Sequence, residues 1–256
     1  MIRRINSVLR QASLVFAGSE ALATYARQFN TSNTYVIPTS YERILDPTSN
    51  RTVEPITIGW IGNTGNMFFL DMIDEAMAAI QKQFINVRFS VMSGKAPEGL
   101  KTRWELVKWS KQAEDSWLRS IDIGLMPLKD DKWSQGKCAF KLLQYMAYGK
   151  PVVASAVGAN HQAVIEGLSG FLATTTEQWK KSIEKLVSDP ALRMTMGRKG
   201  LEHFLENYER QHVQKKIQIS CMRTIQNTAL DEKIDTRPYH KKDIAGSALN
   251  RFIRVV

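Results

Sequence analysis

Hydrophobic and polar positions along this chain of 256 residues alternate between two periods. Short apolar runs bounded by glycine, proline or polar residues predict buried strands, and longer segments with apolar residues three or four apart predict helices. The strands predicted in this way are 13–17, 35–37, 56–61, 87–92, 106–109, 122–126, 151–154 and, at a sheet edge, 170–173. The predicted helices are 20–28, 66–84, 114–120, 138–148, 161–166, 176–188, 190–207 and 209–227.

Strands that alternate with helices predict an α/β fold built on a doubly wound parallel sheet. Ligands of such sheets bind beyond the carboxyl ends of the strands, in a crevice where the strand order switches. We therefore expect the functional site in the loops at this edge, which follow Ile61, Met92, Trp109, Met126 and Ala154.

Two segments lack this periodicity. Residues 39–54 are polar, contain a proline and are predicted to be a linker. The tail 231–256 has mixed charge and weak patterning, and we expect it to be partly ordered at best.

The chain carries a formal net charge of +10, from 35 basic and 25 acidic residues. The basic residues are spread out, with no run of five or more. This spread suits a general attraction to polyanions, including an anionic membrane face, better than a dedicated groove for DNA. A basic but unspecialised surface is the simpler interpretation, and we expect no nucleic acid partner.

Several classes of chemistry lack support in the sequence. No apolar run approaches the roughly 20 residues of a membrane-spanning helix, and the N-terminal residues do not have the pattern of a signal peptide. Cys138 and Cys221 show no metal-ligand spacing and indicate reduced thiols in a cytoplasmic protein. The H-E-x-x-H and G-x-S-x-G patterns of hydrolases are absent.

The first candidate site is the loop from Gly62 through Asn63 and Thr64 to Asn66, between a predicted strand and a helix. Its glycines would let the backbone approach phosphate oxygens, and a helix N-terminus attracts negative charge. Neither the dinucleotide fingerprint G-x-G-x-x-G nor the P-loop pattern is present. The loop is therefore equally consistent with phosphate binding and with a plain tight turn.

The second candidate site is the stretch GKCAFKLLQYMAYGKPVVAS, residues 136–155. Free backbone N–H groups in its predicted first helical turn, together with Lys137 and Lys141, would hold a diphosphate. Gly149 can end the helix in the left-handed conformation, and Pro151 prevents its continuation.

The same helix can also be interpreted as an amphipathic helix with a solvated polar face. That face would carry Lys137, Lys141, Gln144 and Tyr148, and the core side Phe140, Leu143 and Met146. Because the helix lies between two buried strands and starts at the expected ligand crevice, we favour the anion site.

Other positions show weaker signals for a role in binding or catalysis. Trp109 could face a nucleobase or pack in the core. Asp130 and Asp131, in a strand-to-helix loop, could bind sugar hydroxyls or a metal, although an exposed charged turn is commoner. His161 suits a capping or solvent role better than acid–base catalysis.

Together these motifs resemble the donor-binding domain of family 4 type glycosyltransferases, the glycosyl transferases group 1, which have the two-domain GT-B fold. The resemblance covers about residues 10–225, and its motifs occur in the family's order and spacing. They are DIGLMPL (122–128), the stretch 136–155, VGANHQAVIEG (157–167), SGFLA (169–173) and GWIGN (59–63). AGSEALATYA (17–26) and YVIPTS (35–40) are similar to the last βα units of the family's acceptor domain.

The resemblance implies a nucleotide-diphosphate sugar as donor, retention at the anomeric carbon, and neither a metal nor a cofactor. The diphosphate-binding residues expected on this basis are Gly62, Asn63, Thr64, Lys137, Ala139, Phe140 and Lys141. Of the two glutamates that the family places around this helix, the ribose-binding one falls on Gln144 and the sugar-binding one on Gly136. Gln144 can still hydrogen-bond ribose hydroxyls, whereas Gly136 has no side chain, so Lys137 or Asp131 would contact the donor sugar.

The resemblance also predicts the domain organisation. Residues 1–45 would be the remnant of an acceptor domain, 46–227 the nucleotide-sugar-binding domain, and 228–256 a C-terminal tail. The acceptor pocket of the family has no counterpart, so the N-terminal half of the GT-B fold is expected to be truncated.

We interpret the chain as a glycosyltransferase of surface-polysaccharide or lipid-linked glycan assembly, acting on a glycan or lipid-linked acceptor. The expected location is cytoplasmic, with a peripheral contact at the inner face of the membrane as an option. The alternative is a non-catalytic nucleotide-binding fragment, or a half-enzyme that needs a separate acceptor-domain chain. A nucleotide-sugar epimerase shares the architecture, but no acid–base set is evident in the crevice.

The first eleven residues have an amphipathic pattern. Ile2, Ile5, Val8 and Leu9 lie on one side of a helix, with Arg3, Arg4 and Arg10 among them. Such a helix could lie on a membrane, although packing on a sheet is commoner.

Overall fold

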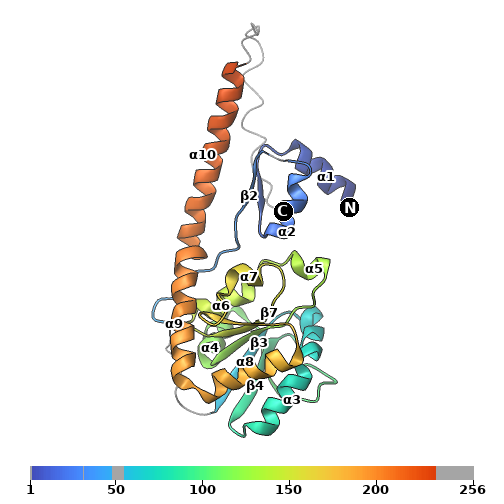
Figure 1. Ribbon diagram of the computed structural model, residues 1–256, viewed down its shortest axis with the longest axis vertical. Helices are drawn as coiled ribbons and strands as arrows, with labels where there is room; N and C mark the ends of the chain where they lie inside the picture. Colours follow the sequence, from blue (N-terminus) through green and yellow to red (C-terminus); the bar gives the residue numbers. More distant parts are fainter. Residues whose placement is uncertain (1, 31, 48–54, 235–256) are drawn as a thin grey trace. The chain divides into compact units, whose positions relative to one another are not determined.

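The chain forms two compact units, and the larger one, Ser40–Arg210, contains the main sheet (Figure 1). The smaller unit combines Met1–Thr39 with Gln211–Val256. The computed structural model describes residues 2–30, 32–47 and 55–234. The domain bounds 1–45, 46–227 and 228–256 stay predictions.

The main sheet has six parallel strands in the order β5-β4-β3-β6-β7-β8. They are β3 (Ile56–Ile61), β4 (Val87–Ser93), β5 (Trp104–Lys108), β6 (Ile123–Met126), β7 (Val152–Ser155) and β8 (Gly170–Ala173). The chain builds outward from β3 in one direction and then returns to build outward from β6 in the other, so the strand order switches between these two strands. This is the doubly wound α/β arrangement that the alternating pattern predicts.

Helices cover both faces of the sheet (Figure 1). One face packs against α3 (Asp74–Gln83) and α8 (Thr176–Ser188), and the other against α4 (Lys111–Ser120), α6 (Phe140–Ala147) and α7 (Asn160–Ala163). Helix α9 (Pro190–Asn207) contributes Met196 to the first core and Phe204 to the second. Successive side chains of β3 point to opposite faces of the sheet, so this strand contributes to both cores. Ile58 and Trp60 pack in the core on the α3 and α8 side, and Ile61 packs in the core on the α4, α6 and α7 side.

Local signals in the sequence set several helix ends. Asp189 accepts a hydrogen bond from the N–H of Leu192 at 2.9 Å and Pro190 begins α9, which spans the predicted residues 190–207. Gly149, with φ of +65°, follows α6 as a left-handed stop.

The predicted helix 66–84 is wrong in its first half. The chain there forms two 3₁₀ turns, Thr64–Phe69 and Asp71–Ile73, before α3 begins at Asp74. The buried residues Met67, Leu70 and Ile73 recur every third position. A 3₁₀ helix has three residues per turn, so this spacing places all three on one side, whereas an α-helix would spread them.

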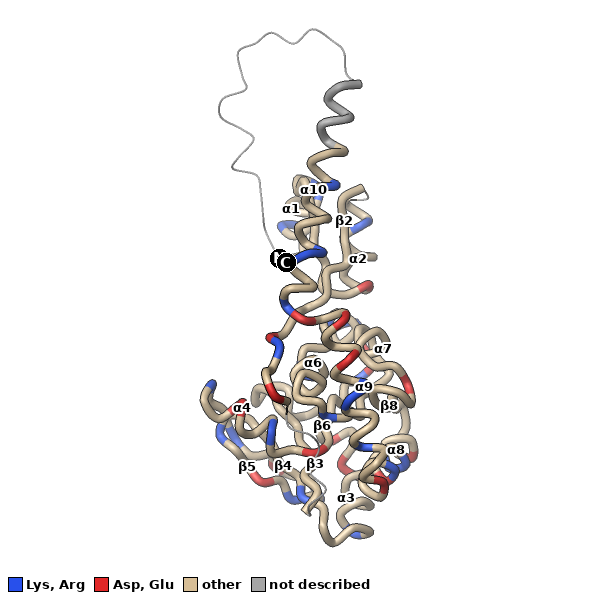
Figure 2. Tube along the Cα trace, turned by 90° about the vertical axis from the view of Figure 1, so that its left-hand side faces the viewer, with Lys and Arg blue, Asp and Glu red and all other residues tan. Residues whose placement is uncertain are grey.

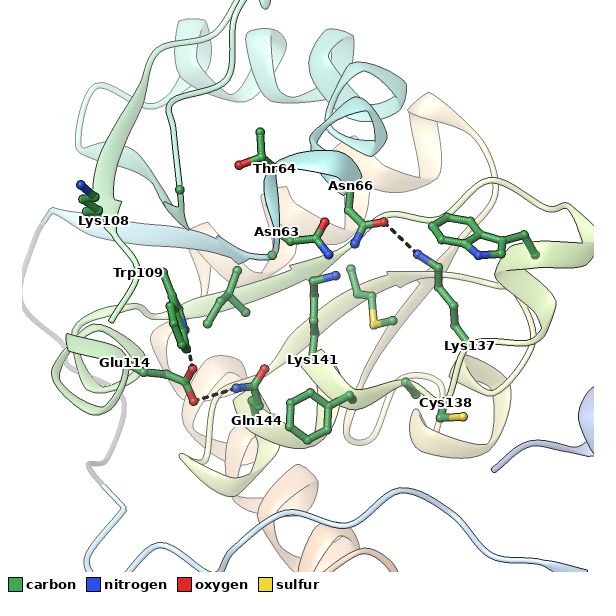
Figure 3. A pocket seen from close by; sticks show the side chains of 17 residues that line it. Asn63, Thr64, Asn66, Lys108, Trp109, Glu114, Lys137, Cys138, Lys141 and Gln144 are labelled. Atoms are coloured by element: carbon green, nitrogen blue, oxygen red, sulfur yellow. Dashed lines mark hydrogen bonds between the residues drawn. The ribbon is translucent and has the colours of Figure 1, made fainter. Parts of the chain in front are cut away.

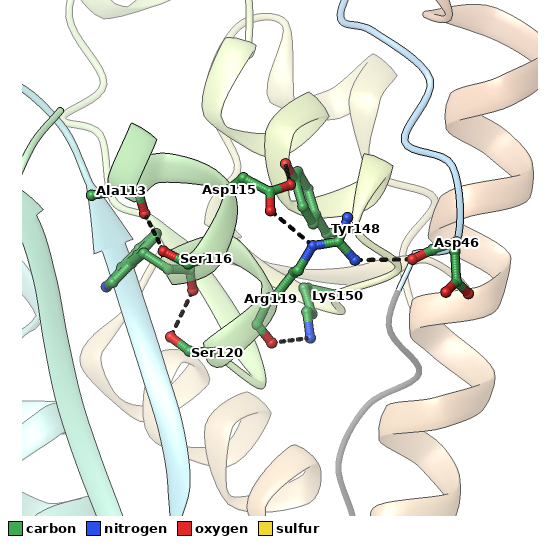
Figure 4. Close-up of polar contacts among 9 residues, drawn as sticks. Asp46, Ala113, Asp115, Ser116, Arg119, Ser120, Tyr148 and Lys150 are labelled. Carbon is green, nitrogen blue, oxygen red and sulfur yellow. Dashed lines mark hydrogen bonds and ion pairs between the residues drawn. The ribbon is translucent and has the colours of Figure 1, made fainter. Parts of the chain in front are cut away.

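The first part of the predicted linker packs on the sheet unit. The N–H of Tyr41 donates to the carbonyl of Tyr208 at 3.2 Å, and the Arg119 guanidinium donates to the carbonyl of Asp46 at 2.9 Å (Figure 4). Arg119 also pairs with Asp115, which accepts a hydrogen bond from the Tyr148 hydroxyl at 2.7 Å. Residues 48–54 of the predicted linker lie outside the described residues.

The smaller unit has its own short parallel pair of strands. It contains α1 (Ile2–Gln11), β1 (Val15–Ala17), α2 (Glu20–Arg27), β2 (Thr34–Val36) and most of α10 (Arg210–Ile234). Leu9, Val15 and Ala26 form its small apolar cluster, and the side chain of Ser19 caps α2 by accepting the N–H of Leu22. Helix α10 runs past the predicted end at 227, and the tail from 235 lies outside the described residues.

Two observations concern the membrane contact and the basic surface that the sequence suggests. Among the helices of the described ranges, none is long and apolar enough to cross a membrane. Figure 2 shows Lys and Arg interspersed with Asp and Glu along the elements of the sheet unit.

Candidate functional site

A cavity of about 820 Å³ opens beyond the carboxyl ends of β3, β4, β5 and β6 (Figure 3). It lies at the switch in strand order, where the topology places the ligand sites of doubly wound sheets. The cavity is lined by Ile61, Gly62, Asn63, Thr64, Asn66, Gly94, Lys108, Trp109, Glu114, Met126, Trp133, Lys137, Cys138, Ala139, Phe140, Lys141 and Gln144.

Most of the predicted site residues meet in this cavity. Those that line it are Gly62, Asn63, Thr64, Lys137, Ala139, Phe140, Lys141 and Gln144. Asp131 and Gly136, the residues predicted for the donor sugar, are not among the lining residues. Nor is any residue of the loop after β7, which was expected at this edge.

Asp131 has a structural task in a helix that sequence reasoning missed. Its carboxylate accepts the backbone N–H of Ser134 at 2.8 Å and caps the short helix α5 (Lys132–Gln135). This hydrogen bond holds the pKa of Asp131 below its ordinary value. The neighbouring Asp130 accepts a hydrogen bond from the Gln135 side chain at 2.8 Å.

The buried hydroxyl of Tyr145 bridges β3 and β6 where the two strands separate at the switch point. Strands β3 and β6 pair only at Ile58–Ile123 and Gly59–Gly124. Beyond this pairing, the Tyr145 hydroxyl accepts the N–H of Ile61 at 3.0 Å and donates to the carbonyl of Leu125 at 3.2 Å. The strand ends therefore separate without leaving these two backbone groups unpaired.

Helix α6 begins at Phe140, two residues later than predicted. Ala139 precedes it with φ of +55° in the left-handed region, and no side chain caps the helix. The left-handed Ala139 separates Lys137 from the helix, so Lys137 does not share a helical face with Lys141 and Gln144. Phe140 is 44% exposed and lines the cavity, so its predicted place in the core is wrong, whereas Leu143 and Met146 are buried as expected.

Lys141 is half-buried in the middle of the cavity wall (Figure 3). Its ammonium lies 5.2 Å from the centre of the Trp60 ring. Burial, and then the charge of Lys137, lower the pKa of Lys141 to about 8. A Cβ at Gly62 would stand 2.4 Å from the Trp60 ring and 3.1 Å from Cε of Lys141, so this close packing requires a glycine.

Lys137 lies at one end of the cavity among aromatic rings. Its ammonium is 3.7 Å from the centre of the Trp133 ring and 4.5 Å from that of Phe69, distances typical of cation–π contacts. It also donates to Oδ1 of Asn66 at 3.3 Å. Partial burial lowers the pKa of Lys137, and the charge of Asp131 opposes this shift.

The opposite end of the cavity is organised by Glu114, which sequence reasoning missed. Its carboxylate accepts hydrogen bonds from Nε1 of Trp109 and from Nε2 of Gln144, each at 2.9 Å (Figure 3). It also accepts one from the hydroxyl of Tyr41 at 3.3 Å. Burial, and then the charge of Glu114, raise the pKa of Tyr41. The available signal was an acidic residue at the start of a helix that follows a strand ending at the crevice.

Of the positions with weaker sequence signals, Trp109 lines the cavity and His161 does not. Trp109 is 53% exposed and lines the cavity, so the core-packing alternative is wrong. His161 lies exposed on α7, away from the cavity lining. In the part of the chain that the structure describes, no group of three or more His, Cys, Asp or Glu residues is placed to hold a metal ion.

The sequence model of one protein family, described as glycosyl transferases group 1, matches residues 55–189. This range is more than half of the 256 residues and contains every residue that lines the cavity. The chain belongs to the glycosyl transferases group 1 family. The predicted family is thereby confirmed.

Two curated relatives of this glycosyl transferases group 1 chain match it over about a third of its length. A D-inositol 3-phosphate glycosyltransferase of Arthrobacter sp. is 34% identical over 89 residues, which are 34% of this chain and 20% of that protein. A D-inositol 3-phosphate glycosyltransferase of Pseudarthrobacter chlorophenolicus is 33% identical over 85 residues, 32% of this chain and 19% of that protein. The matched segment thus spans about a fifth of the length of these curated relatives.

Solved structures confirm the fold of this glycosyl transferases group 1 chain. Anabaena HepE, in complex with UDP and glucose, superposes with a TM-score of 0.66 at 18% identity, over 82% of this chain and 63% of that one. The C-terminal domain of LpcC, a glycosyl transferase group 1 family protein from Francisella tularensis, gives a TM-score of 0.52 at 18% identity, over 60% of this chain and 87% of that one. The predicted α/β fold with a parallel, Rossmann-like sheet, as in GT-B proteins, is confirmed.

Proposed function

We propose that this chain binds a nucleotide-diphosphate sugar in the switch-point cavity and takes part in transfer of the sugar to a glycan or lipid-linked acceptor. The observation that carries the proposal is the position of Lys141 and the uncapped start of α6 in the middle of that cavity. Backbone N–H groups at a helix start and a nearby cation together attract a diphosphate.

The end of the cavity near Glu114 suits the nucleoside. Because the carboxylate of Glu114 can only accept hydrogen bonds, the Gln144 amide must turn its NH₂ group toward Glu114. The carbonyl oxygen of Gln144 is then left as an acceptor for ribose hydroxyls, which is the character that a glutamate would have at this position. Trp109, half-exposed beside it, offers an aromatic face to a base.

The chemical role that we propose for this site is positioning and stabilisation of the leaving diphosphate. As the bond between the anomeric carbon and the diphosphate breaks, negative charge grows on the departing oxygens. A fixed cation and oriented N–H groups stabilise that charge, and such preorganised electrostatic contacts are often the largest part of catalysis. We propose that the transfer proceeds with retention and without a metal, as the family resemblance implies.

The relatives support this proposal in their own right. HepE was solved in complex with UDP and glucose, and the curated relatives are named as glycosyltransferases. UDP sugars are therefore the first donors to test. A role in surface polysaccharide assembly, in the cytoplasm at the inner face of the membrane, is part of the same proposal.

Nucleotide binding is the direct test. Isothermal titration and thermal unfolding with UDP and GDP should reveal binding, and a ligand at about 100 times its Kd should add about 2.7 kcal/mol to the free energy of unfolding. Lys141→Met should weaken binding about 10- to 100-fold, because one charge-assisted contact is worth about 1.5–3 kcal/mol. Lys82→Met, on the exposed surface of α3, is the matched control. No binding of either nucleotide at millimolar concentration would overturn the proposal.

A second candidate function is nucleotide binding without turnover by this chain alone. It is favoured by the cavity, whose lining residues all come from 61–144 of the sheet unit. In that case, transfer requires an acceptor-binding domain from a separate chain. Assays of the chain alone and with such a partner distinguish the two, since transfer by the isolated chain rejects the second.

A further inference from the structure

The two lysines of the cavity stand in different places (Figure 3). Lys141 lies in the middle, close to Gly62 and between the two ends of the cavity. Lys137 lies at the end formed by Asn66 and Trp133, opposite the end formed by Glu114, Gln144 and Trp109. A ligand with its nucleoside near Gln144 and its diphosphate over Lys141 would therefore extend its sugar toward Lys137. This placement rests on the proposed function.

The positive charge of Lys137 is not neutralised by an ion pair with any described residue. Among the described residues, no carboxylate lies within ion-pair distance of its ammonium. Asp131 acts on it through space, but the carboxylate of Asp131 caps α5 and is not part of the cavity lining. Glu114 is the acidic residue of the described lining, and it lies at the far end, where it accepts three hydrogen bonds.

This end of the cavity thus differs from a subsite for a neutral sugar. Carboxylates are good acceptors for sugar hydroxyls, but Gly136 has no side chain and the carboxylate of the described lining, Glu114, lies at the far end; Oδ1 of Asn66 accepts a hydrogen bond from Lys137. What this end offers is a cation held against two aromatic rings, Trp133 and Phe69, which stack with their centroids 6.0 Å apart. Such an ammonium attracts a carboxylate and forms a charge-assisted hydrogen bond with it.

We propose that the donor sugar carries a carboxylate, as in a nucleotide-diphosphate uronate, and that Lys137 binds this carboxylate and selects for it. Lys137 is then a specificity-determining residue of the sugar end of the cavity and not a second ligand of the diphosphate. Asn66 holds the ammonium in place until the carboxylate arrives.

Binding measurements with three related ligands test the assignment. Isothermal titration with UDP, UDP-glucose and UDP-glucuronate, or the matching GDP series where GDP is the better ligand, compares the affinities of wild type, Lys137→Met and the surface control Lys82→Met. Wild type should bind the uronate about tenfold or more tightly than the neutral sugar nucleotide. Lys137→Met should remove this preference and change the affinity for UDP by less than about threefold, since its target is the sugar.

Different results overturn different parts of the reasoning. Equal affinity of wild type for the uronate and the neutral sugar overturns the inference while leaving the proposed function in place. A loss of UDP affinity in Lys137→Met as large as its loss of uronate affinity shows that Lys137 binds the diphosphate, which also overturns it. If wild type binds none of these nucleotides, both the proposed function and the inference fail. Thermal unfolding of each variant shows whether it is folded.

Discussion

Removing the carboxylate of Glu114 should weaken both the fold and the nucleoside end of the cavity. The structure gives this carboxylate three donors, from Trp109, Gln144 and Tyr41. Gln144 is only 4% exposed, so in Glu114→Ala its amide group loses its partner with little access to water. The same change frees the Gln144 side chain to rotate, and its carbonyl oxygen no longer points to one place.

The expected loss of stability can be worked from these contacts. An unpaired buried donor costs about 1–3 kcal/mol. The exposed contact with Trp109 and the 3.3 Å contact with Tyr41 add little, because water can replace them. We therefore expect a loss of about 2 kcal/mol in the free energy of unfolding. For a domain of this size, that loss lowers Tm by about 4–8 °C. Glu114→Gln, which keeps an acceptor in the same place, should cost about half as much.

Thermal unfolding of the ligand-free variants, followed by nucleotide titration, measures both effects. Glu206→Ala is the matched control, because Glu206 is exposed on α9. The nucleotide affinity of Glu114→Ala should fall about tenfold, the consequence of losing roughly one oriented hydrogen bond. A Tm within about 1 °C of wild type, together with unchanged affinity, would refute the idea that Glu114 holds Gln144 in place.

Three further predictions concern the switch point and the cavity wall. Tyr145→Phe should lose about 2 kcal/mol in denaturant unfolding, because the buried N–H of Ile61 loses its acceptor; an unchanged midpoint would contradict this. Gly124→Ala should lose about 1–3 kcal/mol in the same assay, since a Cβ there would stand 2.3 Å from the buried Tyr145 ring; a stable variant would mean that the ring can move. Nucleotide affinity should fall as pH rises through the lowered pKa of Lys141, about 8, because the deprotonated amine no longer attracts a diphosphate, and Lys141→Met should flatten this dependence in titrations at several pH values. Between the lowered pKa of about 8 and the ordinary lysine pKa of 10.5, the unfolded chain binds more protons at this position than the folded one, so ligand-free stability should instead rise with pH in that range.

Much of the fold follows from patterns that are local in the sequence. The strand 56–61 and the helices 176–188 and 190–207 have the predicted bounds, because apolar periodicity and caps such as Asp189 act between neighbours along the chain. The alternation of strands and helices, read in order, also predicted the parallel sheet and the edge at which Gly62, Lys141 and Gln144 meet.

Errors arose where tertiary packing chose between local alternatives. The run after Thr64 is compatible with an α-helix, but burial of Met67, Leu70 and Ile73 on one side favours 3₁₀ turns. Phe140 belongs to the cavity and not to the core, because α6 starts after a left-handed Ala139 and its first residue faces outward.

The sequence by itself determined most of the elements, their order and the edge of the sheet where a ligand would bind. The tertiary structure alone decided which side chains meet there. Gln144 and Glu114 are 30 residues apart, and Ile61 and Tyr145 are 84 apart. The physical reason is that periodicity and capping report on contacts within a few residues, whereas the partner of a buried polar group is set by how distant elements pack.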